Sequence, residues 1–116
     1  MKQNISIKDA HRLESILEAI SKILKYTGKF QNYNDFYNDE EAFDAVLMNF
    51  IIIGEMVSKM SDEIKNTYNK IDWNRIKDFR NLVAHDYFGI DAEEVWQIIT
   101  NDLPKLEKDI LTILKA

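Results

Sequence analysis

The sequence predicts an all-α fold, an antiparallel up-and-down bundle of four main helices plus a short helix. Apolar residues recur three and four positions apart along most of the 116 residues, as on one face of a helix. The chain has only three Gly and one Pro, whereas sheets and barrels need many turn residues. It has no Cys, which excludes disulfide-stapled folds, zinc ribbons and cysteine nucleophiles.

The length predicts a single domain over residues 1–116, because domains usually contain about 100 to 200 residues. The composition, 46% hydrophobic and 30% charged, provides a core without a long polar tract. The first residues lack a signal-peptide core, and the best apolar stretch, residues 45–53, is too short to cross a membrane. We therefore expect a cytoplasmic protein with no membrane partner.

The first helix is expected to begin after Ser6, whose hydroxyl can cap free amides, and to end at Gly28. Its apolar stripe consists of Ile7, Ala10, Leu13, Ile16, Leu17, Ile20, Ile23 and Leu24. Residues 29–38 hold three Asn and four aromatic residues without a clean period, which indicates a loop or short turn that packs its rings on the bundle.

The next helix is expected to start near residues 39–41 and to run to about Met60. It is apolar nearly all round, which is typical of a central, buried helix. Gly54 lies inside it, where Gly costs up to about 1 kcal/mol relative to Ala, so a neighbouring helix is expected to approach closely there. Ser61 can cap a short helix that reaches about Asn69.

Asp72 can cap a further helix, which is expected to reach about residues 85–88 before Gly89 ends it. Its inward residues are expected to be Trp73, Ile76, Phe79, Leu82 and Val83.

Asp91 and Glu94 have the spacing of a capping box for the last segment. Pro104 within that segment predicts a kink or a split. Its helical stripe consists of Val95, Ile98, Ile99, Leu103, Leu106, Ile110 and Ile113.

The two histidines are not at metal-ligand spacing, so neither a metal site nor a cofactor is expected. His11 is expected to face solvent or the rim of the bundle, because it lies one residue beyond the apolar stripe. His85 belongs to a polar run over residues 80–87, with Arg80 and Tyr87. This run has two interpretations.

In the structural interpretation, the run is a helix end where the dipole favours His85 and an acid pairs with Arg80. In the functional interpretation, the same residues cleave RNA: imidazole takes the proton of the ribose 2′-hydroxyl, and guanidinium stabilises charge on the phosphoryl oxygens. On an ideal helix Arg80 and His85 lie about 140° apart. Either the helix loosens before His85, or a second copy completes the site across a homodimer.

Charge points to the same segment. The net charge of −5 argues against a general nucleic-acid coat protein. Residues 65–80 nevertheless have a net charge of +3, from Lys65, Lys70, Arg75, Lys77 and Arg80 against Asp72 and Asp78. The segment is either a basic patch that leads to the motif or a solvated charged face.

Glu55 stands among apolar neighbours and needs a partner, for which Arg80 is a candidate. Asp44 lies eleven residues before it, on the same helix face.

The run from Arg80 through His85 to Tyr87 resembles the Arg, four residues, His, one residue, Tyr motif of the HEPN superfamily, and more narrowly the HepT-like ribonuclease toxins. The resemblance covers about residues 7–114. It extends to five further segments, which are residues 52–55, residues 71–76, Ile90-Asp91, Val95-Trp96 and Asp102-Leu103-Pro104.

This resemblance implies a metal-independent endoribonuclease in which Arg80 and His85 form the catalytic pair across a dimer. Asn81 would support the pair. With the pairing and charge arguments above, Glu55 is a second supporting candidate, and Lys77, Arg75 and Lys70 are candidates to contact the RNA, with no DNA substrate expected. It also implies a toxin–antitoxin pair, in which a nucleotidyltransferase antitoxin of the MntA type silences the toxin by transferring AMP to Tyr87.

A second hypothesis belongs to another class: a non-catalytic helical subunit that binds a nucleotidyltransferase and its nucleotide or substrate. The two hypotheses differ in the role of His85. In the ribonuclease it must transfer a proton, whereas in the binding subunit it needs only to form a hydrogen bond.

Overall fold

The computed structural model describes residues 5–81 and 92–115, and no strand occurs within them. The helices have these bounds: α1 (Ile7–Thr27), α2 (Tyr33–Asn38), α3 (Glu40–Lys59), α4 (Asp62–Thr67), α5 (Trp73–Lys77), the 3₁₀ turn η1 (Asp78–Asn81), α7 (Ala92–Gln97), the π-helical turn η2 (Ile98–Asp102) and α8 (Leu103–Lys115). The predicted all-α class is confirmed.

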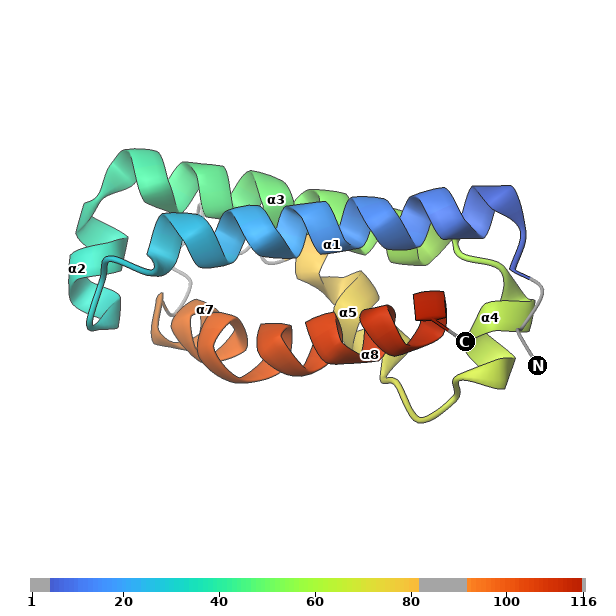
Figure 1. The fold of residues 1–116 in the computed structure, drawn as a ribbon. Helices are drawn as coiled ribbons and strands as arrows, with labels where there is room; N and C mark the ends of the chain where they lie inside the picture. The colour runs from blue at the N-terminus through green and yellow to red at the C-terminus, as the bar shows by residue number, and fades with distance from the viewer. Residues whose placement is uncertain (1–4, 82–91, 116) are drawn as a thin grey trace.

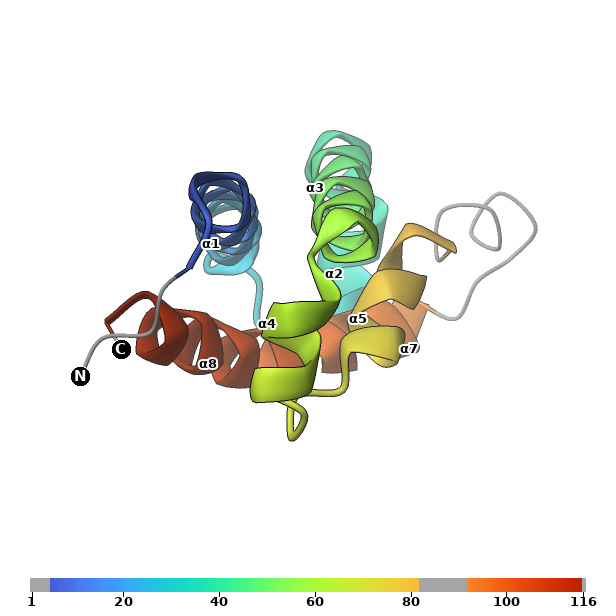
Figure 2. The same ribbon diagram turned by 90° about the vertical axis from the view of Figure 1, so that its right-hand side faces the viewer.

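The bundle is built around the antiparallel pair of α1 and α3, the two longest helices (Figure 1). The run from α7 through η2 to α8 crosses below this pair, and α5 lies beside α3 on the side away from α1 (Figure 2). The arrangement is the HEPN-like bundle that the sequence predicted. No helix in the described part of the chain is long and apolar enough to cross a membrane.

The first helix begins and ends where the sequence predicted. The Ser6 side chain accepts a hydrogen bond from the Asp9 N–H at 3.1 Å, and Gly28 follows the helix with a φ of −61°, so no left-handed residue is needed. Leu13, Ile16, Ile20 and Ile23 are fully buried. Ile7 is 76% exposed, so its place in the stripe was wrong, because it lies in the first turn at one end of the bundle (Figure 1).

Residues 33–38 form the helix α2, so the expected loop or turn was wrong for this part. Asn32 caps the helix, since its side-chain oxygen accepts from the Asp35 N–H at 2.9 Å, and its side-chain amide also donates to the Asp35 carboxylate at 3.2 Å. The expected ring packing is confirmed, since Phe36 is fully buried with its ring centroid 5.2 Å from Phe43 and 5.6 Å from Trp96.

The second long helix, α3, has the predicted bounds, but burial on every side was wrong. Met48 is 58% exposed and Ile52 is 37% exposed, because no described element covers that face. The short helix α4 is capped by Ser61, as predicted.

Asp72 caps α5, and Trp73, Ile76 and Phe79 are buried as predicted. The α-helix ends at Lys77 and tightens into the 3₁₀ turn η1, so a regular α-helix across residues 78–81 was wrong. The expected helix end at residues 85–88 lies outside the described residues. Leu82, Val83, Gly89 and Asp91 lie outside the described residues.

Pro104 splits the last helical segment, as predicted. The turn before it is π-helical, and the Leu103 N–H donates to the carbonyl of Ile98, five residues back. Proline has no N–H to donate and its ring crowds the preceding turn, so the widened turn accommodates it. Ile98, Ile99 and Leu103 remain buried.

The buried carboxylate of Asp9 ties α1 to α4. Asp9 is 2% exposed and accepts hydrogen bonds from the Ser61 hydroxyl, from the Ser61 N–H at 3.2 Å and from the Arg12 guanidinium at 3.2 Å. Burial raises the pKa of Asp9, but these bonds favour the carboxylate more strongly, and the resulting pKa lies below the ordinary value of 3.8.

We expect Asp9→Asn to lower the free energy of unfolding by about 1 to 3 kcal/mol at pH 7, because an amide cannot accept all of these bonds. A carboxyl whose pKa is lower in the folded than in the unfolded state stabilises fully above the unfolded pKa and loses this effect as pH falls through the folded pKa. Urea unfolding between pH 7 and pH 2 should therefore show the two proteins converging below about pH 4. Glu14→Gln, at an exposed position of α1, is the control; an equal loss there would contradict the assignment.

Candidate functional site

The helix α3 and the α5–η1 segment lie in close contact at Gly54. A β-carbon on Gly54 would lie 2.8 Å from the Arg80 Cβ, 2.8 Å from the Lys77 carbonyl oxygen and 2.9 Å from the Arg80 nitrogen. Non-bonded atoms do not approach a carbon so closely without a shift of the backbone. The predicted close approach is confirmed, and the neighbour that requires the glycine is the backbone that carries Arg80.

This approach brings Arg80 beside Glu55, the residue that follows Gly54. The Arg80 Nη1 donates to the Glu55 Oε1 at 3.4 Å, so the predicted partner of Glu55 is confirmed. The two side chains are 35% and 44% exposed. A long contact between half-exposed groups is weak and screened by water. It uses one nitrogen of the guanidinium and leaves the other N–H donors of Arg80 available.

Some of the other predicted site residues lie within the described part of the chain, and some lie outside it. Asn81 is exposed at the end of η1, and Lys77 is half-buried one turn before Arg80. His85 and Tyr87 lie outside the described residues. The 3₁₀ turn begins at Asp78, so ideal α-helical spacing does not apply across residues 78–81.

The basic segment does not form a uniform cationic surface. Arg75 donates from Nε at 2.9 Å and from Nη2 at 2.6 Å to one oxygen of Asp102. The hydrogen bonds and charge of Asp102, with smaller effects of Asp72 and Glu94, raise the pKa of Arg75 above its ordinary value. Sequence reasoning missed this pair, although both residues lie in segments that carried the family resemblance.

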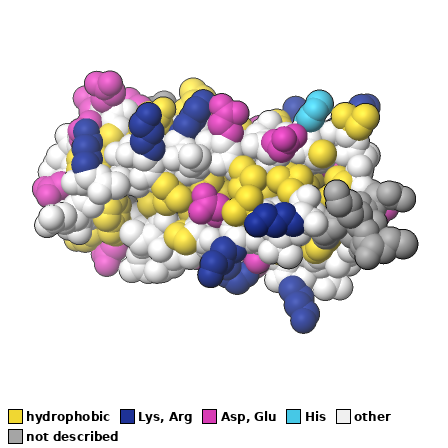
Figure 3. Space-filling model, in the orientation of Figure 1, with side chains coloured by type: hydrophobic (Ala, Val, Ile, Leu, Met, Phe, Trp, Pro, Cys, Tyr) yellow, Lys and Arg dark blue, Asp and Glu magenta, His cyan; other side chains and the backbone are white. Residues whose placement is uncertain are grey.

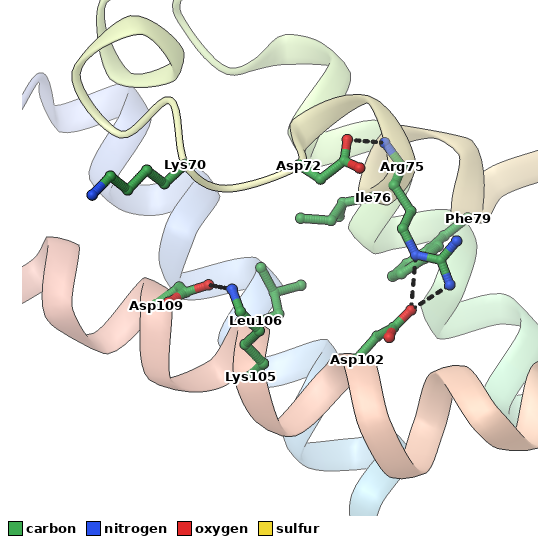
Figure 4. Close-up of a pocket in the computed structure, with 9 residues that line it drawn as sticks. All are labelled: Lys70, Asp72, Arg75, Ile76, Phe79, Asp102, Lys105, Leu106 and Asp109. Atoms are coloured by element: carbon green, nitrogen blue, oxygen red, sulfur yellow. Dashed lines mark hydrogen bonds and ion pairs between the residues drawn. The ribbon is translucent and has the colours of Figure 1, made fainter.

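A cavity of about 200 Å³ lies beside this pair, between α5–η1 and the start of α8 (Figure 4). Three Lys or Arg and three Asp side chains line it over an apolar floor of Ile76, Phe79 and Leu106. On the face shown in Figure 3, basic and acidic side chains are likewise interspersed. The part of the basic segment that borders this cavity is therefore not a uniformly cationic surface.

His11 is exposed, as predicted. Within residues 5–81 and 92–115, His, Asp and Glu side chains form no group of three that could hold a metal ion.

Comparisons with known proteins agree with the sequence motifs. A family model described as "Ribonuclease HepT-like" matches residues 16–113. A Methanocaldococcus jannaschii protein named "Gamma-glutamylcyclotransferase and putative RNase" is 35% identical over 103 residues, which cover 89% of this chain and 46% of that protein. The chain thus spans about half the length of this relative.

Two relatives match over most of their length. A "Putative RNase" of the same organism is 32% identical over 98 residues, 84% of this chain and 89% of that protein. A "Probable ribonuclease HepT" of Thermococcus cleftensis is 31% identical over 103 residues, 87% of this chain and 93% of that protein. No solved structure gives a significant match. On the family model and these relatives, the chain belongs to the HepT-like ribonuclease family, a family of RNA-hydrolysing enzymes.

Proposed function

We propose that the chain is a metal-independent endoribonuclease and the toxin of a toxin–antitoxin pair, acting in the cytoplasm as one domain over residues 1–116. The observation that carries this proposal is the placement of Arg80 beside Glu55 at the Gly54 contact, in a chain of the HepT-like ribonuclease family. Glu55 contacts the guanidinium, which stays partly exposed, so a phosphate can reach it.

The reaction divides between two side chains. His85 removes the proton of a ribose 2′-hydroxyl, and that oxygen attacks the adjacent phosphorus. The bond from phosphorus to the 5′-oxygen breaks and that oxygen takes up a proton from water, which leaves a 2′,3′-cyclic phosphate and a 5′-hydroxyl end. Arg80 stabilises the charge that develops on the phosphoryl oxygens, and Asn81 provides a further polar group beside it.

Lys77 and Lys70 extend the contact to neighbouring RNA phosphates, since both belong to the basic segment that ends at Arg80. Arg75, the third RNA contact proposed from the sequence, already donates from two nitrogens to Asp102, so a phosphate would compete with that carboxylate for it.

The first test is incubation of labelled RNA in EDTA with the wild-type protein, His85→Ala and Arg80→Ala. We expect each substitution to reduce cleavage at least about a hundredfold, because proton transfer and charge stabilisation each contribute that much. Glu55→Gln should cost less, about tenfold, since it only orients Arg80. His11→Ala, at the other histidine, should cleave normally.

Cleavage products that end in a 2′,3′-cyclic phosphate would support the mechanism. If wild-type protein of verified intact mass leaves the RNA uncut, the nuclease proposal fails and the chain is better explained as the subunit that binds a nucleotidyltransferase.

We also propose a homodimer that pairs the two sites. Met48 and Ile52 are exposed, and along α3 they lie seven and three residues before Glu55, so the three residues share one face of the helix. Exposed apolar side chains beside a polar site favour a protein contact there.

If this face forms the dimer, Ile52→Glu should shift the mass measured by light scattering from twice 13.7 kDa toward 13.7 kDa, the mass of one chain. The same substitution should abolish cleavage, because the site would lose its second copy. Leu111→Glu, at a similarly exposed position of α8, should leave the mass unchanged. A wild-type monomer that still cleaves RNA would contradict the composite site.

We propose that regulation acts at Tyr87. Its phenol oxygen would attack the α-phosphorus of ATP in an antitoxin of the nucleotidyltransferase class, and pyrophosphate would leave. The added AMP brings negative charge and bulk to the position where an RNA phosphate binds.

Co-expression with such a nucleotidyltransferase should add one or more AMP units to the intact mass of the wild-type chain and none to Tyr87→Phe. Tyr37→Phe, at a tyrosine that is 47% exposed, serves as the control and should still be modified. An unmodified wild-type chain under these conditions would remove the regulatory part of the proposal.

A further inference from the structure

We infer that Arg75 and Asp102 are positioning residues that hold the α5–η1 segment, and with it Arg80, in place for the reaction. The catalytic part of this inference rests on the proposed function. The geometric part stands on contacts alone: Arg75 in α5 donates twice to Asp102 at the end of η2, at 2.6 Å and 2.9 Å (Figure 4).

The α5–η1 segment needs external support. The helix α5 has five residues and η1 has four, and isolated helices of this length are not stable in water. The helix α3 supports one side through the Gly54 contact and the Glu55–Arg80 pair. The Arg75–Asp102 pair ties the segment on another side to the η2–α8 run, across a sequence separation of 27 residues.

The π-helical turn sets the position of Asp102. Residues 98–102 form this turn directly before Leu103 and Pro104. A π turn holds an extra residue, so the side chain at its end, that of Asp102, points in a direction that a continuous α-helix would not give. Leu103 is fully buried, which anchors the turn in the core while Asp102 remains at the surface beside Arg75.

The surroundings of Arg75 do not favour an RNA phosphate. Asp102 occupies two of its donors, and the charges of Asp72 and Glu94 also act on it. An approaching phosphate would compete with these carboxylates and be repelled by them. Arg75 therefore acts on the fold of the site and not on the substrate.

The Arg75–Asp102 pair is too exposed to contribute much to the stability of the whole fold. The Arg75 and Asp102 side chains are 54% and 33% exposed, and ion pairs of this kind contribute little to unfolding free energy. Its effect is expected to be local, on the geometry of residues 78–81.

The test compares Arg75→Gln, Arg75→Lys, Asp102→Asn, the double variant with Gln and Asn, and the exchanged pair Arg75→Asp with Asp102→Arg. Cleavage of labelled RNA gives kcat and KM, and hydrogen–deuterium exchange reports on the amides of residues 78–81. Asp109→Asn is the matched control, because Asp109 pairs with Lys105 at 3.0 Å in the same cavity but within a single helix.

We expect Arg75→Gln and Asp102→Asn each to lower kcat about tenfold with little change in KM, and the double variant to lose no more than either one. Exchange at residues 78–81 should become faster in all three, with little change in melting temperature. The exchanged pair should recover part of both effects. Arg75→Lys should resemble Arg75→Gln, since lysine cannot donate from two fixed nitrogens. Asp109→Asn should match the wild type.

An RNA-binding role for Arg75 predicts a different pattern. Arg75→Gln would raise KM, Arg75→Lys would be nearly normal, and Asp102→Asn would lower KM by releasing the guanidinium. That pattern, or unchanged exchange at residues 78–81 in Arg75→Gln and Asp102→Asn, would overturn the inference. Hydrogen exchange gives this answer even if the wild-type chain leaves RNA uncut, so failure of the proposed function is distinguishable from failure of the positioning pair.

Discussion

The arrangement of the candidate site depends on the contact between α3 and the α5–η1 segment at Gly54. At this point the backbone that carries Lys77 and Arg80 lies so close to α3 that there is no room for a β-carbon. Glycine is unfavourable inside a helix, but here it permits the approach that puts Glu55 within reach of the Arg80 guanidinium. Any larger residue would separate the two elements and move Arg80 away from α3.

The remainder of the bundle keeps this contact in register. The pair of α1 and α3 forms the long axis of the core, and α8 closes it from below through fully buried residues such as Ile110 and Ile113 (Figure 1). Asp9 fixes the end of the bundle where α3 passes into α4, since it binds the cap residue Ser61. The short α5 then follows from this fixed end of the bundle and packs Trp73 and Ile76 into the core, and η1 adds Phe79.

The candidate site could be predicted from the sequence in part. Glu55 and Arg80 could be paired because a carboxylate among apolar neighbours needs a cation, and the structure confirms that pair. The Arg75–Asp102 pair could not, because 27 residues and a π turn separate its members, and the direction of Asp102 follows from that turn. The net charge of residues 65–80 likewise did not show that Arg75 pairs with Asp102, a carboxylate from a distant segment.

The sequence by itself determined the class of the fold and most helix boundaries, because caps and breakers act locally: Ser6, Ser61, Asp72 and Pro104 act as their residue types predicted. It also carried the family, through motifs spread over the chain. Only the tertiary structure decided which apolar residues are buried and where α5 ends. Periodicity identifies an apolar face, but burial requires a neighbour on that face, and so Ile7, Met48 and Ile52 remain exposed while Phe36 is enclosed.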